Sequence, residues 1–372
     1  MKRTTLLTAI TISCALISVH TAFGGQGETA NILSEIERLA SSSVEADRSL
    51  GESVAEGIEK SPAVVSSALL TKLRGKNLTE KQLAVYVWAL GLTKDQAGVP
   101  AIKELHQQSR SDLVQGNCLR ALAAIGGKQG GEYLLSAFDA TSDKDKRFDI
   151  LNLLGQMRYE PALQRAEELL RQDPKSLYWQ SIFVFGKMGD TAVPFLLKRI
   201  GDKDRNIRAN SINVLGLWLI SPEATKPMQD QFWAEKDAEL RGMLLSSLER
   251  TIADAAQLQA VFGKIVAEEK DTKLVQYARE TLGGMKQMTD HLSSFAQKKI
   301  PSAASFGIEY AAIFKSAGNK GNYEMLGVYS TAQDEPRLKA LRERILQRNS
   351  DEAFYDYQKI NEIIMLNRMI KK

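Results

Sequence analysis

The feature that most constrains the fold of this chain is a short motif that recurs at nearly constant spacing. Each copy closes a stretch of small and apolar residues with a glycine, as in VWALG, LAAIG and LNLLG. Successive copies lie 29 to 35 residues apart along the 372-residue chain. A period of this length is typical of proteins in which every repeat supplies one supersecondary unit. The anchor positions are Gly57, Gly91, Gly126, Gly155, Gly186, Gly216, Glu249 (where the glycine is replaced) and Gly283.

Each interval between anchors has the same internal plan. A few turn residues lead into a helix with a proline near its start, where the missing backbone N–H would have had no partner. A polar break and a second helix follow, with apolar residues such as Ile207, Val214 and Leu215 at helical spacing. We predict an all-α fold, an α-solenoid superhelix of about eight helical hairpins over residues 25–290, with helical caps. The prolines are Pro62, Pro100, Pro161, Pro194 and Pro227.

Three of the second helices share an acidic and a basic position. The arginine lies eight residues before the anchor, and the aspartate lies four residues before the arginine. We predict that the aspartate caps the helix N-terminus by accepting backbone N–H groups. The arginine would bond to the acid or to carbonyl groups of the next turn and so stitch repeats together; a row of arginines that binds an anion is the alternative. The pairs are Asp143 with Arg147, Asp204 with Arg208, and Asp237 with Arg241.

The segment GDTAVPFLLKRIGDKDRNIRANSINVLG, residues 189–216, resembles a HEAT repeat of the short bacterial type named after phycobilisome lyases. It has the Gly-Asp turn, the Ala-Val-Pro helix start, and the Asp-x-Asp and Arg positions of that family. The resemblance extends over residues 57–290 and is weakest at Glu249. It implies a fold and not an activity, because function depends on sites carried by a fold.

The stretch IGGKQGG, residues 125–131, places four glycines around Lys128 and raises the question of a phosphate-binding loop. A Walker loop needs Gly-x-x-x-x-Gly-Lys-Ser/Thr between a strand and a helix, whereas here the lysine comes too early and a helix precedes it. We predict instead that Gly126 leaves one helix in a left-handed conformation and turns into the next. The same turn role is predicted for Gly57, Gly91, Gly155, Gly186, Gly216 and Gly283.

The first residues have the three parts of a secretory signal peptide. Lys2 and Arg3 precede a short apolar stretch, and Ala22-Phe23-Gly24 offers small residues at the two positions that a signal peptidase reads. We predict that residues 1–24 are removed after Gly24 and that the protein is exported, to the periplasm or beyond. No later segment is long and apolar enough to span a bilayer.

Both ends of the chain differ from the repeats. Residues 29–40 and 44–57 form a first, more polar helical pair. Residues 291–372 form a divergent C-terminal region, with helices predicted at 301–317, 336–348 and 350–370. The apolar face of the last helix is predicted to close the open end of the solenoid, and docking of a partner on this face is the alternative. That face comprises Phe354, Tyr357, Ile360, Ile364 and Met365.

Few residues are suited to catalysis. Without residues 1–24 the chain has one cysteine, Cys118, and two histidines, His106 and His291. None has partners at the spacing of a metal site or a catalytic triad, so we predict no catalytic, cofactor or metal site. The net charge of +4 falls to +2 without Lys2 and Arg3, too little to favour nucleic acid.

These observations favour an exported, non-enzymatic scaffold that binds a protein partner in the periplasm or envelope, because solenoids present long binding surfaces. An inhibitor or self-protection factor of an exported hydrolase would have the same fold. The resemblance also implies a third alternative, an enzyme such as a chromophore lyase. Enzymes of that kind act inside the cell, which the export signal disfavours.

Overall fold

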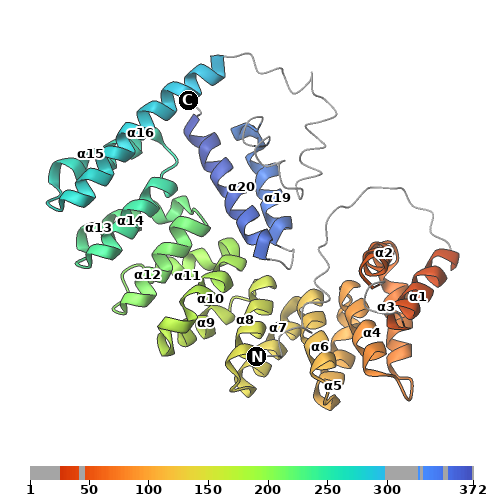
Figure 1. Ribbon diagram of the computed structural model, residues 1–372. Coiled ribbons are helices and arrows are strands. Elements are labelled where there is room, and N and C mark those ends of the chain that lie inside the picture. Colours follow the sequence, from red (N-terminus) through yellow and green to blue (C-terminus); the bar gives the residue numbers. More distant parts are fainter. Residues whose placement is uncertain (1–25, 42–46, 298–325, 327–329, 347–350, 371–372) are drawn as a thin grey trace, which may run out of the picture. The chain divides into compact units, whose positions relative to one another are not determined.

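The computed structural model describes residues 26–41, 47–297, 326, 330–346 and 351–370 (Figure 1). All regular structure in these ranges is helical, which confirms the predicted all-α fold. None of the helices described is both long and apolar enough to cross a bilayer. The predicted signal peptide and the helix predicted at residues 301–317 lie outside the described residues.

Within the described ranges, sixteen helices follow one another as eight hairpins, as expected for an α-solenoid. From α3 onward, the first helix of each pair leads through a short connection into the second (Figure 1). The pairs are α1 (Gln26–Ser41) with α2 (Asp47–Lys60), α3 (Pro62–Leu73) with α4 (Glu80–Leu92), α5 (Val99–Gln108) with α6 (Asp112–Ile125), α7 (Gly127–Ala140) with α8 (Lys144–Gln156), α9 (Ala162–Gln172) with α10 (Pro174–Lys187), α11 (Val193–Leu197) with α12 (Arg205–Asn213), α13 (Thr225–Ala234) with α14 (Ala238–Thr251), and α15 (Ala255–Glu268) with α16 (Thr272–Gln297).

Short turns of other helical types complete several hairpins. The 3-10 turns η1 (Gln96–Gly98), η2 (Gly189–Ala192) and η4 (Pro222–Ala224) precede α5, α11 and α13. The π-helical turn η3 (Val214–Trp218) continues α12. Pro62, Pro100 and Pro194 lie in the first turns of α3, α5 and α11, where the missing N–H breaks no helical hydrogen bond.

The hairpins belong to two compact units, Met1–Ala162 and Leu163–Lys372. The range 25–290, predicted as one domain, therefore includes hairpins of both units. Each unit is held by apolar side chains between its helices. Leu90, Leu122 and Leu154 are fully buried in the first unit, and Phe232 and Phe262 in the second. Since the protein has no disulfide among the described residues, packing of this kind holds the hairpins together.

The prediction that the anchor glycines form turns holds only for Gly126, which ends α6 with a φ of +75°. The others lie inside helices or, for Gly216, inside η3, so the turn role predicted for them is wrong. The reason for two of them is close helix packing: a Cβ on Gly91 would lie 2.8 Å from the Cα of Ala121, and one on Gly216 would collide with Ser247. Nothing in the structure explains the glycine at 283. The helical positions are Gly57, Gly91, Gly155, Gly186, Gly216 and Gly283.

The C-terminal region ends in a further hairpin in the second unit, formed by α19 (Glu335–Leu346) and α20 (Asp351–Ile370) after the 3-10 turn η5 (Ala332–Asp334). The prediction that α20 closes the open end of the array is wrong. Helix α20 packs on α19 and lies against α10, η3 and α14, the second helices of earlier hairpins (Figure 1). The side chains of Tyr357 and Ile360 are fully buried there.

Candidate functional site

The predicted aspartates lie at the turns between the two helices of their hairpins. Asp143, Asp204 and Asp237 are the N-cap residues of α8, α12 and α14. In each case a carboxylate oxygen accepts the backbone N–H two residues later, at 2.9, 2.8 and 3.0 Å respectively. These bonds satisfy N–H groups that have no partner within the helix.

The predicted arginines lie four residues into the same helices and reach back over the turn. Arg147 Nε donates to the carbonyl of Thr141 at 2.6 Å, and Arg208 Nη1 donates to that of Asp202 at 2.8 Å. In both cases the acceptor is six residues earlier in the chain. Each of these two arginines therefore fastens the turn before its own helix, in addition to any contact with the next repeat.

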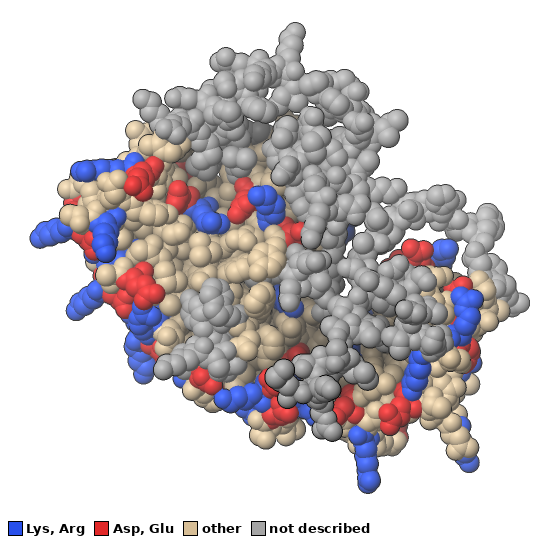
Figure 2. All heavy atoms as spheres, in the orientation of Figure 1, with Lys and Arg blue, Asp and Glu red and all other residues tan. Residues whose placement is uncertain are grey.

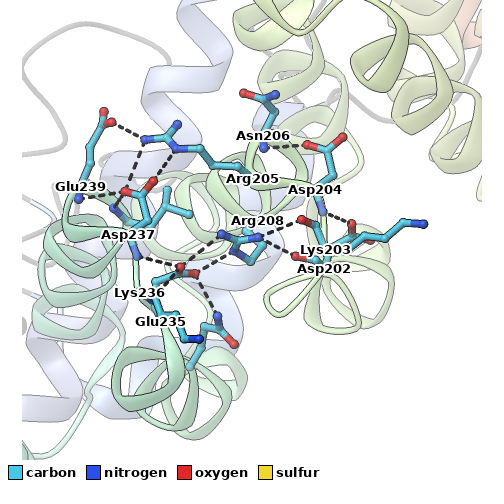
Figure 3. Close-up of polar contacts among 12 residues, drawn as sticks. Asp202, Lys203, Asp204, Arg205, Asn206, Arg208, Glu235, Lys236, Asp237 and Glu239 are labelled. Atoms are coloured by element: carbon cyan, nitrogen blue, oxygen red, sulfur yellow. Dashed lines mark hydrogen bonds and ion pairs between the residues drawn. The ribbon is translucent and has the colours of Figure 1, made fainter.

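Two of the arginines also bind a glutamate of the next hairpin. Arg208 pairs with both carboxylate oxygens of Glu235, at 2.7 and 3.1 Å (Figure 3). Arg241 pairs in the same way with Glu269. Glu235 also accepts the backbone N–H groups of Lys236 and Asp237. One buried carboxylate thus ties its own turn to the arginine of the preceding repeat.

Sequence reasoning missed these glutamates, although the sequence carries a signal for them. An acidic residue, a lysine and an aspartate recur at 202–204 (DKD), 235–237 (EKD) and 269–271 (EKD). The third residue of each triplet is the cap: Asp271 accepts the N–H of Lys273 at 2.9 Å, at the start of α16. The first residue is the partner of an arginine. The cap can be recognised from its own helix, whereas the first residue of the triplet acts on an arginine in a different repeat.

The charges around these carboxylates shift their pKa values. Burial raises the pKa of Glu235, but the N–H of Asp237 and the Arg208 guanidinium outweigh burial and hold the pKa below its ordinary value. The Arg171 guanidinium, 2.7 Å from Asp202, lowers the pKa of that carboxyl. All of these carboxylates are therefore ionised at neutral pH.

A second line of ion pairs runs beside the first. Arg171 of α9 binds Asp202 in the following hairpin and Glu167 in its own helix. Arg205 of α12 binds the capping residue Asp237 at 2.7 Å and also Glu239 (Figure 3). The bonds to Asp202, Asp237 and Glu239 again join one hairpin to the next, so the same two turns are held by several charged groups.

In the first unit, neutral groups take the same positions. The hydroxyls of Ser109 and Thr141 accept the backbone N–H two residues later, as Glu235 does in the second unit. Gln115 donates to the carbonyl of Ser109 at 2.8 Å, again six residues back, where Arg208 stands in the later repeat. The turn geometry is shared, whereas the largely buried arginine–glutamate links described above lie in the second unit. In the first unit the hairpins are also joined by ion pairs, but these are more exposed, such as Lys146 with Asp112 at 3.2 Å.

A cluster of reactive residue types in the first unit also serves packing. His106 Nδ1 lies 2.9 Å from the hydroxyl of Tyr133, which joins α5 to α7. Burial lowers the pKa of His106 and raises that of the Cys118 thiol to about 12. The thiol is buried and protonated at neutral pH, which is the inert form. Among the described side chains, which do not include His291, no cluster of His, Cys, Asp and Glu could hold a metal ion.

The second helices of the first unit also present an accessible surface. Leu113 and Arg120 lie about two helical turns apart on the same face of α6, and Asp149 lies on α8. All three side chains are exposed, Leu113 to 48%. Neighbouring protein atoms nevertheless remove part of the water around the two charged groups. This desolvation raises the pKa of Asp149 and lowers that of Arg120. This set of Leu113, Arg120 and Asp149 is the exposed stripe of the first unit.

Residues 159–249 match the family of HEAT repeats. This range contains two of the capped turns of the second unit, those that carry Asp204, Arg208, Glu235, Asp237 and Arg241. Residues 159–249 are HEAT repeats. No curated protein matches the chain. Among solved structures, human deoxyhypusine hydroxylase in complex with glycerol has 14% sequence identity and a TM-score of 0.29, over 72% of this chain and 99% of that one.

The contacts of the arginines help to decide between their two predicted roles, which are links between repeats and a row that binds an anion. An arginine that binds a free anion must present unoccupied N–H groups, but Arg208 and Arg241 already hold carboxylates of the next hairpin. Their arrangement therefore favours stitching of HEAT repeats over an anion-binding row. The line of ion pairs gives the array a defined geometry on which a binding surface can be built.

Proposed function

We propose that the chain is an exported, non-enzymatic scaffold that binds a protein partner through the second helices of its hairpins. The observation that carries the proposal is the exposed stripe of the first unit, Leu113, Arg120 and Asp149. An exposed leucine beside an arginine and an acid is a combination that protein interfaces use, with arginine enriched and a polar rim around apolar contact.

The distribution of charge supports a protein partner over a polyanion. The formal net charge is +4, and a nucleic-acid surface would need a basic stripe. On the face drawn in Figure 2, acidic and basic side chains alternate along the edge of the second unit instead of separating into patches of one sign. Such a surface selects a partner by local complementarity and not by long-range attraction.

The repeat architecture supports a scaffold for a mechanical reason. Each hairpin contacts mainly its neighbours, so the bonds between hairpins determine how their surfaces line up. In the second unit these bonds are the pairs Arg208–Glu235 and Arg241–Glu269, whose side chains are largely buried. A surface held in one geometry loses less entropy when a partner binds, which favours affinity.

Export is tested directly on the protein as its native cells make it. The expected result is a mature chain in the periplasmic or secreted fraction that begins at Gly25, as read by N-terminal mass spectrometry. A matched variant with Lys2 and Arg3 both changed to glutamate should remain unprocessed in the cytoplasm. Recovery of the wild-type chain in the cytosol with Met1 intact would contradict export.

The binding surface is tested with a photo-crosslinking amino acid placed at Arg120 in native cells. A matched control carries the same amino acid at Val64 on α3, which is exposed but belongs to a first helix. The proposal expects one discrete protein adduct at position 120 and none at position 64. Equal labelling at both positions, or none at either, would contradict it. The identity of the adduct separates a structural scaffold from an inhibitor: an exported hydrolase would indicate inhibition.

A further inference from the structure

In the second unit, the second helices are covered by a segment of the same chain. Helix α20 lies against α10, η3 and α14 and packs most extensively on its own partner α19. Polar side chains bond this C-terminal hairpin to the HEAT repeats, and Leu346 and Tyr357 pack beside Gly189. Their chemistry determines what kind of helix can occupy this surface.

The central contact is made to an irregular helix end. The π-helical turn η3 closes with the N–H of Leu219 on the carbonyl of Val214, and the N–H of Ser221 then bonds to Leu215. The carbonyl of Leu217 therefore does not accept the N–H of Ser221, which would be its donor in a regular α-helix. The carbonyl of Trp218 cannot accept the regular helical bond either, because residue 222 is proline and has no N–H. Both carbonyls are therefore open to donors other than the regular helical one.

Helix α20 supplies those donors from its side chains. Gln358 Nε2 donates to the carbonyl of Leu217 at 2.6 Å, and Asn361 Nδ2 lies 3.5 Å from that of Trp218. Gln358 and Asn361 are three residues apart, so they lie on one face of the helix. The ring of Tyr355 lies 5.8 Å from that of Trp218. A helix therefore caps the end of another helix more than a hundred residues earlier in the chain.

A second contact is made at the turn η2. Arg342 of α19 is buried and bonds to the carboxylate of Asp190 and, at 2.9 Å, to the side-chain oxygen of Asn361. The hydroxyl of Tyr357 lies 3.4 Å from the same carboxylate. The adjacent Gly189 has a φ of +57° and leaves room for Leu346 and Tyr357. One acid of the array thus receives a guanidinium and a phenol from the hairpin.

We propose that the surface formed by η2, η3 and α14 is a helix-binding site, and that α20 occupies it as an intramolecular ligand that a partner helix displaces. This inference rests on the proposed function, because it names the kind of partner that the second unit takes. The partner is an amphipathic helix with amide side chains three residues apart for the two carbonyls and a basic group for Asp190.

Exchange is physically reasonable because the contacts with the array are replaceable. Another helix or water can replace the hydrogen bonds that the amide and guanidinium groups of the hairpin make with the array. The apolar packing between α19 and α20 stays intact when the hairpin leaves the array as a unit. The ion pair between Arg250 of α14 and Glu362 of α20, at 3.3 Å, is partly exposed and adds little to the attachment.

The test uses the full-length protein and a fluorescent synthetic peptide of residues 335–370, the C-terminal hairpin itself. In the double variant Gln358→Ala/Asn361→Ala, the resident α20 loses its bonds to the carbonyls of η3. Fluorescence anisotropy should then show the peptide binding at least about tenfold more tightly than to the wild-type chain, which corresponds to about 1.4 kcal/mol. A peptide carrying the same two substitutions should not bind.

The matched control is Lys359→Ala, which alters an exposed residue of α20 that pairs with Glu362 on the same helix. This variant should bind the peptide as the wild type does. Gln358→Glu provides a second variant of nearly the same shape, in which a carboxylate faces the Leu217 carbonyl; it should also bind more tightly than the wild type. Hydrogen exchange of residues 351–370 should accelerate in both Gln358 variants and not in the control.

The inference is overturned if the folded variants bind the peptide no better than the wild type, or if residues 351–370 keep their protection in them. Helix α20 would then be a fixed part of the second unit. Such a result would leave the proposed binding through Arg120 in the first unit standing, since that surface is probed by crosslinking in a different unit. Failure of the crosslinking test would in turn leave peptide exchange unaffected.

Discussion

Removal of the Glu235 carboxylate is the sharpest test of how the HEAT repeats are held together. The side chain of Glu235 is 4% exposed and that of its partner Arg208 is 16% exposed, so solvent screens the pair only weakly. In Glu235→Ala the guanidinium loses a two-oxygen partner but keeps the carbonyls of Asp202 and Lys203. The structural consequence is a half-satisfied charge at the junction of two hairpins.

The magnitude follows from that arrangement. Breaking a buried pair costs about 3–5 kcal/mol when the remaining charge has no other partner. Because Arg208 keeps two carbonyl partners, we expect a smaller loss than this, about 2–3 kcal/mol of unfolding free energy. For a unit of this size, each kcal/mol lowers the melting temperature by about 2–4 °C. We expect a decrease of about 6 °C.

The assay is urea unfolding followed by circular dichroism, with calorimetry for the melting temperature. The matched control is Glu239→Ala, which removes a carboxylate that is 74% exposed and leaves Arg205 paired with Asp237. The control should lose less than about 0.5 kcal/mol, as exposed ion pairs do. Equal effects of the two substitutions would refute the assignment of Glu235 as the link between repeats.

The pH dependence gives a further check with a definite sign. The pKa of Glu235 is lowered in the folded protein, so its contribution to stability is present above the ordinary glutamate range and is lost as the pH falls through the folded value. The stability difference between the wild type and Glu235→Ala should be constant at neutral pH and should shrink under acid conditions. A difference that grows as the pH falls would contradict the direction of the shift.

Three further predictions follow from single positions. Gly126→Val should lower the unfolding free energy by about 1–3 kcal/mol, because valine is strained at the positive φ of this position. The control Gly242→Ala, at a helical position with open space, should be neutral or stabilising, and equal melting temperatures of the two variants would refute the strain. Cys118 should not react with a thiol reagent at neutral pH until the protein is unfolded, because it is buried and its pKa is raised to about 12; rapid labelling of the native protein would contradict this. Hydrogen bonding from Arg368 lowers the pKa of Glu335 to about 2. Glu335→Gln should therefore lower the stability of the C-terminal hairpin at neutral pH, whereas near pH 2 the variant and the wild type should be equally stable, as measured by hydrogen exchange.

The local features of the repeats could be predicted from the sequence because neighbouring residues determine them. A proline fits a first helical turn, and an aspartate caps a helix, whatever lies across the interface. The turn at Gly126 was predicted for the same reason: IGGKQGG supplies the glycine that a positive φ requires. The structure places Asp143, Asp204 and Asp237 at helix starts, as their position before the second helices indicated.

The partners of these local features could not be derived in the same way. Arg208 finds Glu235 because successive hairpins stack with one particular offset, and nothing within either segment fixes that offset. Gly91 and Gly216 looked like turn residues, but their small size is needed where second helices approach closely, which depends on two segments thirty residues apart.

The position of α20 shows the limit most clearly. Its apolar face indicated that it must be covered, and the sequence alone determined that much about the helix. Only the tertiary structure decided that it lies on α10, η3 and α14 and not on the end of the array. The reason is that its contacts join distant parts of the chain: Gln358 donates to the carbonyl of Leu217, Asn361 lies 3.5 Å from that of Trp218, and no local sequence pattern determines such a pairing.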